Sequence, residues 1–104
     1  MPDFEYLAEQ LGLDTEDFLE LTNLFISTLR DDITRLEKAL QAQDASAARD
    51  VIHAIRGSAG NLGFTAIYLL ASDGENHAME GRLELLTSLP QSFATEVALI
   101  AEAL

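Results

Sequence analysis

The stretch that could do chemistry runs from residue 51 to residue 63 and reads VIHAIRGSAGNLG. It contains His53, one of two histidines in the chain, with Arg56 three residues later. An exposed, neutral imidazole leaves one ring nitrogen free to act as a nucleophile. A guanidinium one helical turn away can neutralise a phosphoryl group placed on that nitrogen. Arg49, one turn before His53, is a second candidate for this role.

Helical periodicity places His53 on a surface. At about 100° per residue, the apolar residues of the segment cluster on the side opposite the imidazole: Ala48, Val51, Ile55, Ala59 and Leu62. Gly57 and Gly60 fall on the same exposed face as His53, where each costs ~1 kcal/mol relative to alanine. The pattern favours a helix surface that another molecule approaches closely. The alternative is that these glycines allow close helix packing inside the protein.

Amphipathic segments before this stretch are expected to support it. A short helix opens at Pro2 and ends at Gly12. A long helix begins at Asp14 or Thr15 and runs to about residue 40. Its apolar residues recur in steps of three or four: Phe18, Leu21, Phe25, Leu29, Ile33, Leu36 and Leu40.

Two further apolar residues of the long helix, Leu24 and Ile26, lie off this stripe. They either widen the core face or form an exposed apolar patch for a partner. Gly74, in a later helix, poses the opposite problem, because it occupies an apolar stripe where a large residue is expected. Tyr68 or Met79 is the candidate to fill the space that it leaves.

The remaining helices follow from caps and breaks. The histidine helix begins at Asp44 or Ser46, runs to about residue 61 and ends with Gly63. Another helix occupies about residues 65–79. A last helix begins at residue 89 or 90 with Ser88 as its cap, after a short helical turn from about residue 83. A single kinked helix is the alternative for this last part.

The fold class follows from these lengths. No segment alternates with a period of two, and short connections between long amphipathic helices imply antiparallel neighbours. We therefore expect an all-α, antiparallel up-down four-helix bundle, with the short N-terminal helix packed over one end. A chain of 104 residues fits a single domain, residues 1–104.

Composition limits the partners. The chain has 18 acidic and 6 basic residues, a net charge of −12, and no cysteine. Phosphate backbones and anionic lipid would repel it, so neither nucleic-acid binding nor membrane insertion is expected. No signal peptide or apolar run of ~20 residues is present, so we expect a monomeric, cytoplasmic protein. His53 and His77 lack the spacing of a metal site, and no metal is expected.

Residues 53–63, HAIRGSAGNLG, resemble the signature of histidine-containing phosphotransfer (HPt) domains. That signature has a histidine, a basic residue three positions on, a glycine four on, a small residue next, and a glycine ten after the histidine. All are matched, with Arg56 in place of the commoner lysine. The family usually has leucine before a glutamate of the following helix, where this chain has Gly74. The resemblance also covers Phe25, Leu36, Asp44 and Glu75.

The resemblance implies that His53 takes a phosphoryl group from the aspartate of a receiver domain and passes it to another receiver. Arg56 would stabilise the phosphoryl group, and Gly57 would leave room for the receiver's loops. Leu24 or Ile26 would dock on the receiver. The receiver would supply the aspartate, Mg²⁺ and most of the catalysis, so this chain would be a carrier, not an enzyme, with no cofactor of its own. The implied partners are response-regulator receiver domains and a sensor histidine kinase.

Two alternatives remain open. Phosphoacceptor domains of chemotaxis-type histidine kinases carry a similar motif, often with Gly-Phe as at Gly63 and Phe64, and they take phosphate from an ATP-binding kinase domain. In the second alternative, the bundle is a scaffold without phosphotransfer that binds a partner through the face of Gly57 and Gly60. On any of these readings, we expect neither a substrate pocket nor a base beside His53.

Overall fold

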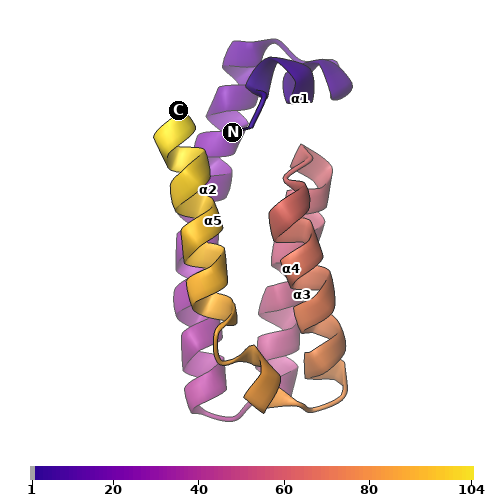
Figure 1. Cartoon of the computed structure of the whole chain (residues 1–104), viewed down its shortest axis with the longest axis vertical. Helices are drawn as coiled ribbons and strands as arrows, with labels where there is room; N and C mark the ends of the chain where they lie inside the picture. The colour runs from indigo at the N-terminus through magenta and orange to yellow at the C-terminus, as the bar shows by residue number, and fades with distance from the viewer. Residues whose placement is uncertain (1) are drawn as a thin grey trace.

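The computed structural model describes residues 2–104, which form helices joined by short connections (Figure 1). Their bounds are α1 (Phe4–Gln10), α2 (Thr15–Gln41), α3 (Ala45–Leu62), α4 (Thr65–Met79), the 3-10 helix η1 (Leu83–Leu86) and α5 (Leu89–Ala103). Helices α2 to α5 alternate in direction along the long axis, and α1 lies across one end (Figure 1). The predicted all-α four-helix bundle with an additional N-terminal helix is confirmed. Within residues 2–104, no helix is both long and apolar enough to cross a membrane.

Local sequence sets the helix ends. The Asp3 carboxylate accepts a hydrogen bond from the backbone N–H of Tyr6, so Asp3 caps α1 and the prediction that Pro2 opens this helix is wrong. Asp44 caps α3 in the same way. Gly63 ends α3 with φ of 85°, a left-handed conformation that costs glycine little.

The C-terminal part resolves an open alternative. η1 is a separate turn, and α5 begins after Ser88 with Pro90 in its first turn, where a missing N–H does no harm. The kinked single helix is therefore wrong. The predicted short turn followed by a separate last helix is confirmed, but the side chain of Ser88 forms no capping hydrogen bond.

The buried face of α2 is broader than the predicted stripe, because α2 packs against α1, α3 and α5. Ile26 is only 5% exposed and belongs to the core. Leu21, predicted to be in the core, is 42% exposed, and Thr22 is buried beside it. The Thr22 hydroxyl donates to the Phe18 carbonyl at 2.9 Å, which satisfies the buried polar group.

Gly74 lies where α4 approaches the start of α5. A Cβ atom built at Gly74 would stand 2.6 Å from Cδ2 of Leu89, so the Leu89 side chain occupies the space. Tyr68 and Met79 are exposed, and the prediction that one of them fills this space is wrong. The missing side chain thus allows α5 to begin close against α4.

Candidate functional site

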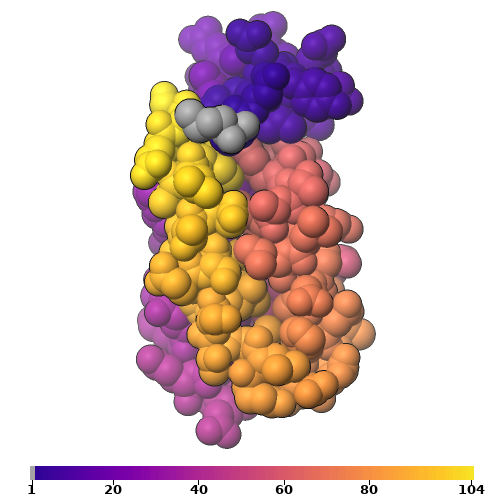
Figure 2. Space-filling view, viewed as in Figure 1, coloured from indigo at the N-terminus to yellow at the C-terminus, as the bar shows by residue number. Residues whose placement is uncertain are grey.

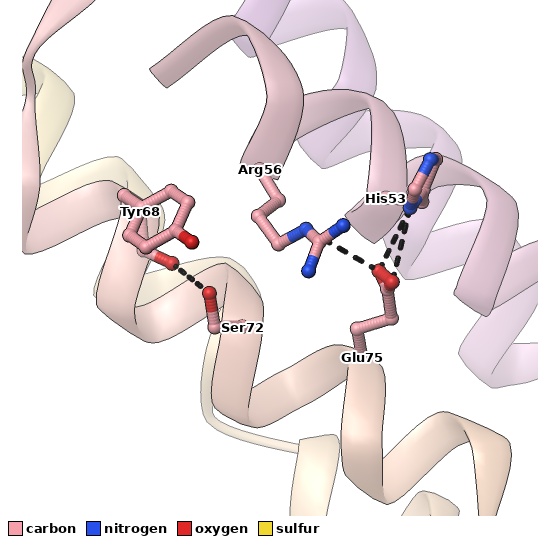
Figure 3. Close-up of polar contacts among 5 residues, drawn as sticks. All are labelled: His53, Arg56, Tyr68, Ser72 and Glu75. Atoms are coloured by element: carbon pink, nitrogen blue, oxygen red, sulfur yellow. Dashed lines mark hydrogen bonds and ion pairs between the residues drawn. The ribbon is translucent and has the colours of Figure 1, made fainter. Parts of the chain in front are cut away.

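His53 lies on the exposed side of α3, as the helical periodicity predicted, with its side chain 63% exposed. Figure 3 shows Glu75 reaching toward it from α4. Nδ1 of His53 lies 2.9 Å from Oε2 and 3.0 Å from Oε1 of Glu75. The imidazole is therefore held at one nitrogen by a carboxylate from a neighbouring helix.

Glu75 is a buried acid whose charge is compensated locally. Its side chain is only 9% exposed, and Oε2 also lies 3.7 Å from Nε of Arg56. A buried carboxylate is costly unless it is paired and hydrogen-bonded. Here two residues of α3, His53 and Arg56, share it (Figure 3). The contact ties α3 to α4 at the level of the histidine.

The Glu75 carboxylate determines which nitrogen of His53 is available. An ionised carboxylate only accepts hydrogen bonds, so Nδ1 carries the hydrogen in the neutral imidazole and Nε2 keeps its lone pair. The second ring nitrogen points away from Glu75 (Figure 3). A nucleophile oriented by a carboxylate is a recurring arrangement in covalent catalysis. The sequence predicts no base beside His53, and what the structure adds is a carboxylate that holds the ring at Nδ1.

Sequence reasoning assigned no role to Glu75, which lies 22 residues after His53 and in another helix. Spacing within one helix cannot reveal such a contact. The only signal was the match of Glu75 to a glutamate of the HPt pattern, and that match by itself did not show a hydrogen bond.

The two glycines near His53 have different surroundings. A Cβ at Gly57 would meet nothing within 4 Å, so this position opens onto free space beside the histidine. A Cβ at Gly60 would lie 3.1 Å from Cδ1 of Tyr68, a residue of α4. Gly60 therefore makes room for the Tyr68 ring in a contact between α3 and α4 at the surface, because Tyr68 is itself 38% exposed. Only Gly57 leaves open space next to it.

The other predicted site residues are more scattered. Arg49 is exposed one turn before His53 and forms no ion pair with residues 2–104. Leu24 is 64% exposed and borders a shallow hollow of about 270 Å³ between α2 and α3, which Ser58 also lines. Ile26 is buried, which excludes it from docking. Only one of the two predicted docking residues is thus on the surface.

His77 is not equivalent to His53. Its Nε2 lies 3.6 Å from Oδ2 of Asp73, and its Nδ1 is buried without a hydrogen-bond partner among the described residues. If Nε2–H faces the carboxylate, the lone pair is on the buried nitrogen. Of the two histidines, His53 has the more accessible side chain, 63% exposed against 29% for His77. Across residues 2–104, no group of three or more His, Cys, Asp or Glu side chains could hold a metal ion.

Comparison with known proteins identifies the family of the chain. The sequence profile of the Hpt domain family matches residues 20–103, most of the chain, including His53, Arg56 and Glu75. Searches of curated proteins and of solved structures gave no significant match. Hpt domains carry phosphoryl groups on histidine in two-component signalling and interact with receiver domains and kinases. By the extent of this match and by its helical bundle, the chain belongs to the Hpt domain family.

Proposed function

We propose that His53 accepts a phosphoryl group from the aspartyl phosphate of a receiver domain and passes it to another receiver. One observation carries this proposal: an exposed imidazole is held at Nδ1 by the buried Glu75 carboxylate, with Nε2 directed outward (Figure 3). Such a group can attack an electrophile brought by another protein. The chain is then a carrier that depends on its partners for catalysis.

The proposed phosphoryl transfer is a displacement at phosphorus. The lone pair of Nε2 forms the N–P bond while the P–O bond to the receiver aspartate breaks and the carboxylate leaves with the electron pair. The hydrogen on Nδ1 stays in its bond to Glu75, which faces the positive charge of the phosphorylated ring. Attack by the carboxylate of a second receiver reverses these steps and frees His53.

The surroundings of His53 suit a large partner. Gly57 leaves open space beside the ring, which suits the loops of a receiver active site. Arg56 is 37% exposed and one turn from His53, so its guanidinium can compensate the added phosphoryl charge. In this proposal Arg49 adds a second positive charge, Leu24 contacts the receiver, and the catalytic Mg²⁺ belongs to the receiver.

A phosphotransfer assay with matched variants tests the proposal. Wild type, His53→Gln and His77→Gln are incubated with phosphorylated receiver domains, and phosphoprotein is followed through acid and alkali treatment. We expect an acid-labile, alkali-stable phosphoryl group on wild type and on His77→Gln, and none on His53→Gln. Equal labelling of His53→Gln would refute the assignment.

A second arm of the assay distinguishes the phosphoryl donors. Wild type is incubated with ATP and a histidine kinase that lacks a receiver domain. Labelling that requires only this kinase would favour the chemotaxis-type phosphoacceptor alternative. Labelling that requires a phosphorylated receiver supports the relay. If no donor labels His53 and His53→Gln leaves signalling intact, the scaffold alternative is correct.

A further inference from the structure

An apolar groove runs between α4 and α5, on a face that contains none of His53, Arg56 and Glu75. Figure 2 looks onto this face, with α4 and α5 side by side and α1 across their ends. The part beneath α1 has a volume of about 550 Å³, and a second hollow of about 500 Å³ adjoins it. Ala66 and Glu96 line both parts, which we together call the α4–α5 groove.

Large apolar side chains stay exposed along this groove. Leu69 of α4 is 59% exposed, Leu99 of α5 is 51% exposed, and Tyr6 of α1 is 56% exposed. All three line the groove. Single exposed apolar residues are ordinary, but a contiguous set around a hollow is typical of a binding surface.

The charge around the groove is one-sided. No lysine or arginine lies in α1, α4 or α5, and the one histidine there is His77, whose Nε2 lies 3.6 Å from Oδ2 of Asp73. The six lysine and arginine residues of the chain are Arg30, Arg35, Lys38, Arg49, Arg56 and Arg82. Glu96 is partly buried between the two hollows and forms no ion pair with residues 2–104. Glu102 also lines the part of the groove beneath α1. The groove thus combines apolar walls with the carboxylates of Glu96 and Glu102, which form no ion pair with residues 2–104.

We propose that the α4–α5 groove binds a basic amphipathic helix of a partner protein. The apolar face of such a helix would cover Leu69 and Leu99, and its lysines or arginines would pair with Glu96 and Glu102. The lining residues of α4 run from Ala66 to Asp73, about two helical turns or ~10 Å, which matches a short docked helix.

Other occupants fit the charge less well. A second copy that presented the same face would bring carboxylates against carboxylates, since α1, α4 and α5 contain no lysine or arginine. An anionic membrane surface would be repelled for the same reason. Because no residue lines both the groove and the His53 site, a partner helix can stay bound while a receiver reaches the histidine.

Binding of a defined probe tests this proposal. The probe is a fluorescent helical peptide of about 14 residues, four turns, with leucine on one face and lysine on the other; a second peptide has glutamate in place of lysine. The groove variant is Glu96→Gln with Leu99→Asn. The matched control, Glu20→Gln with Leu24→Asn, changes the same residue types on the exposed side of α2. Amide NMR shifts of the wild type locate the bound peptide.

We expect the lysine peptide to bind, to shift amides of α4 and α5, and to lose about tenfold in affinity in the groove variant. The control variant should bind as the wild type does, and the glutamate peptide should not bind. Equal weakening in both variants would refute the groove, because it would show general attraction to an acidic protein. Amide shifts confined to α2 and α3, binding to anionic vesicles, or no peptide binding would refute it as well.

Discussion

Replacing Glu75 with glutamine tests whether the buried carboxylate prepares His53 for phosphoryl transfer. Glu75 accepts the 2.9 Å hydrogen bond from Nδ1 and lies 3.7 Å from Nε of Arg56. Glutamine keeps the size of the side chain, and its amide oxygen can still accept a hydrogen bond. The variant therefore removes the negative charge and leaves the geometry nearly intact.

The magnitude follows from the kind of hydrogen bond that is lost. A hydrogen bond to a charged group contributes about 1.5–3 kcal/mol, and a neutral one about 0.5–1.5 kcal/mol. Because the His53 side chain is 63% exposed, solvent screens the charge and the low end of the difference applies, about 1 kcal/mol. Positive charge develops on the ring in the transition state, so we expect phosphoryl uptake to slow about fivefold.

Rapid-quench measurement of phosphoryl uptake from a phosphorylated receiver gives this rate directly. Nitrogen NMR of the imidazole adds a readout of orientation, since the wild type should hold its hydrogen on Nδ1 and Glu75→Gln should give a mixture of tautomers. Glu80→Gln, an exposed change at the end of α4, is the matched control. It should leave the rate and the tautomer unchanged.

An unchanged rate in Glu75→Gln, together with the wild-type tautomer, would refute the reasoning. Glu75 would then only hold α3 against α4. A second outcome would also assign Glu75 a purely structural role. In that outcome Glu75→Gln slows phosphoryl uptake and lowers the melting temperature, but the tautomer of His53 does not change.

Two further predictions concern the bundle. Gly74→Leu places a branched side chain at a position where even an added Cβ would lie 2.6 Å from Cδ2 of Leu89. Overpacking should cost about 3 kcal/mol, and removal of a helical glycine should gain roughly 1 kcal/mol. The unfolding free energy should therefore fall by about 2 kcal/mol. Urea unfolding measures it, Leu89→Ala in the same chain should recover part of the loss, and an unchanged midpoint would contradict the packing argument. Burial raises the pKa of the Asp32 carboxyl above its ordinary value of 3.8, while Arg35 acts in the opposite direction. The folded state therefore binds this proton more tightly than the unfolded state, and the contribution to stability is lost as the pH rises above 3.8 toward the folded value. Asp32→Asn should gain stability relative to wild type across that window, and a pH-independent difference would show that the opposing Arg35 interaction cancels the burial.

The helix boundaries could be predicted because their causes are local. Asp44 as a cap, Gly63 as a terminator and Pro90 near the start of the last helix act through backbone groups a few residues away. The α4 helix covers the predicted residues 65–79. The exposure of His53 likewise follows from the periodicity of its own helix.

Which residues are buried depends on the neighbouring helices and could be predicted only in part. Val51 was placed on the core face of α3, yet it is only partly buried, while Ile52 is fully buried. Ile26 was a candidate for docking and lies in the core, because α2 has neighbours on several sides. Periodicity gives the direction of a stripe to within one or two residues, and the width of the buried face depends on how many helices pack against it.

The sequence by itself determined an all-helical chain, an outward-facing histidine and an adjacent arginine, since these depend on caps and on the repeat of a single helix. Only the tertiary structure placed Glu75 against His53, the Tyr68 ring against Gly60, and Leu89 in the space left by Gly74. The reason is physical: each of these contacts joins two helices, and the rotation and approach of packed helices depend on all the side chains between them. Exposure of His53 could thus be predicted from the sequence, whereas its orientation by Glu75 is visible only in the structure.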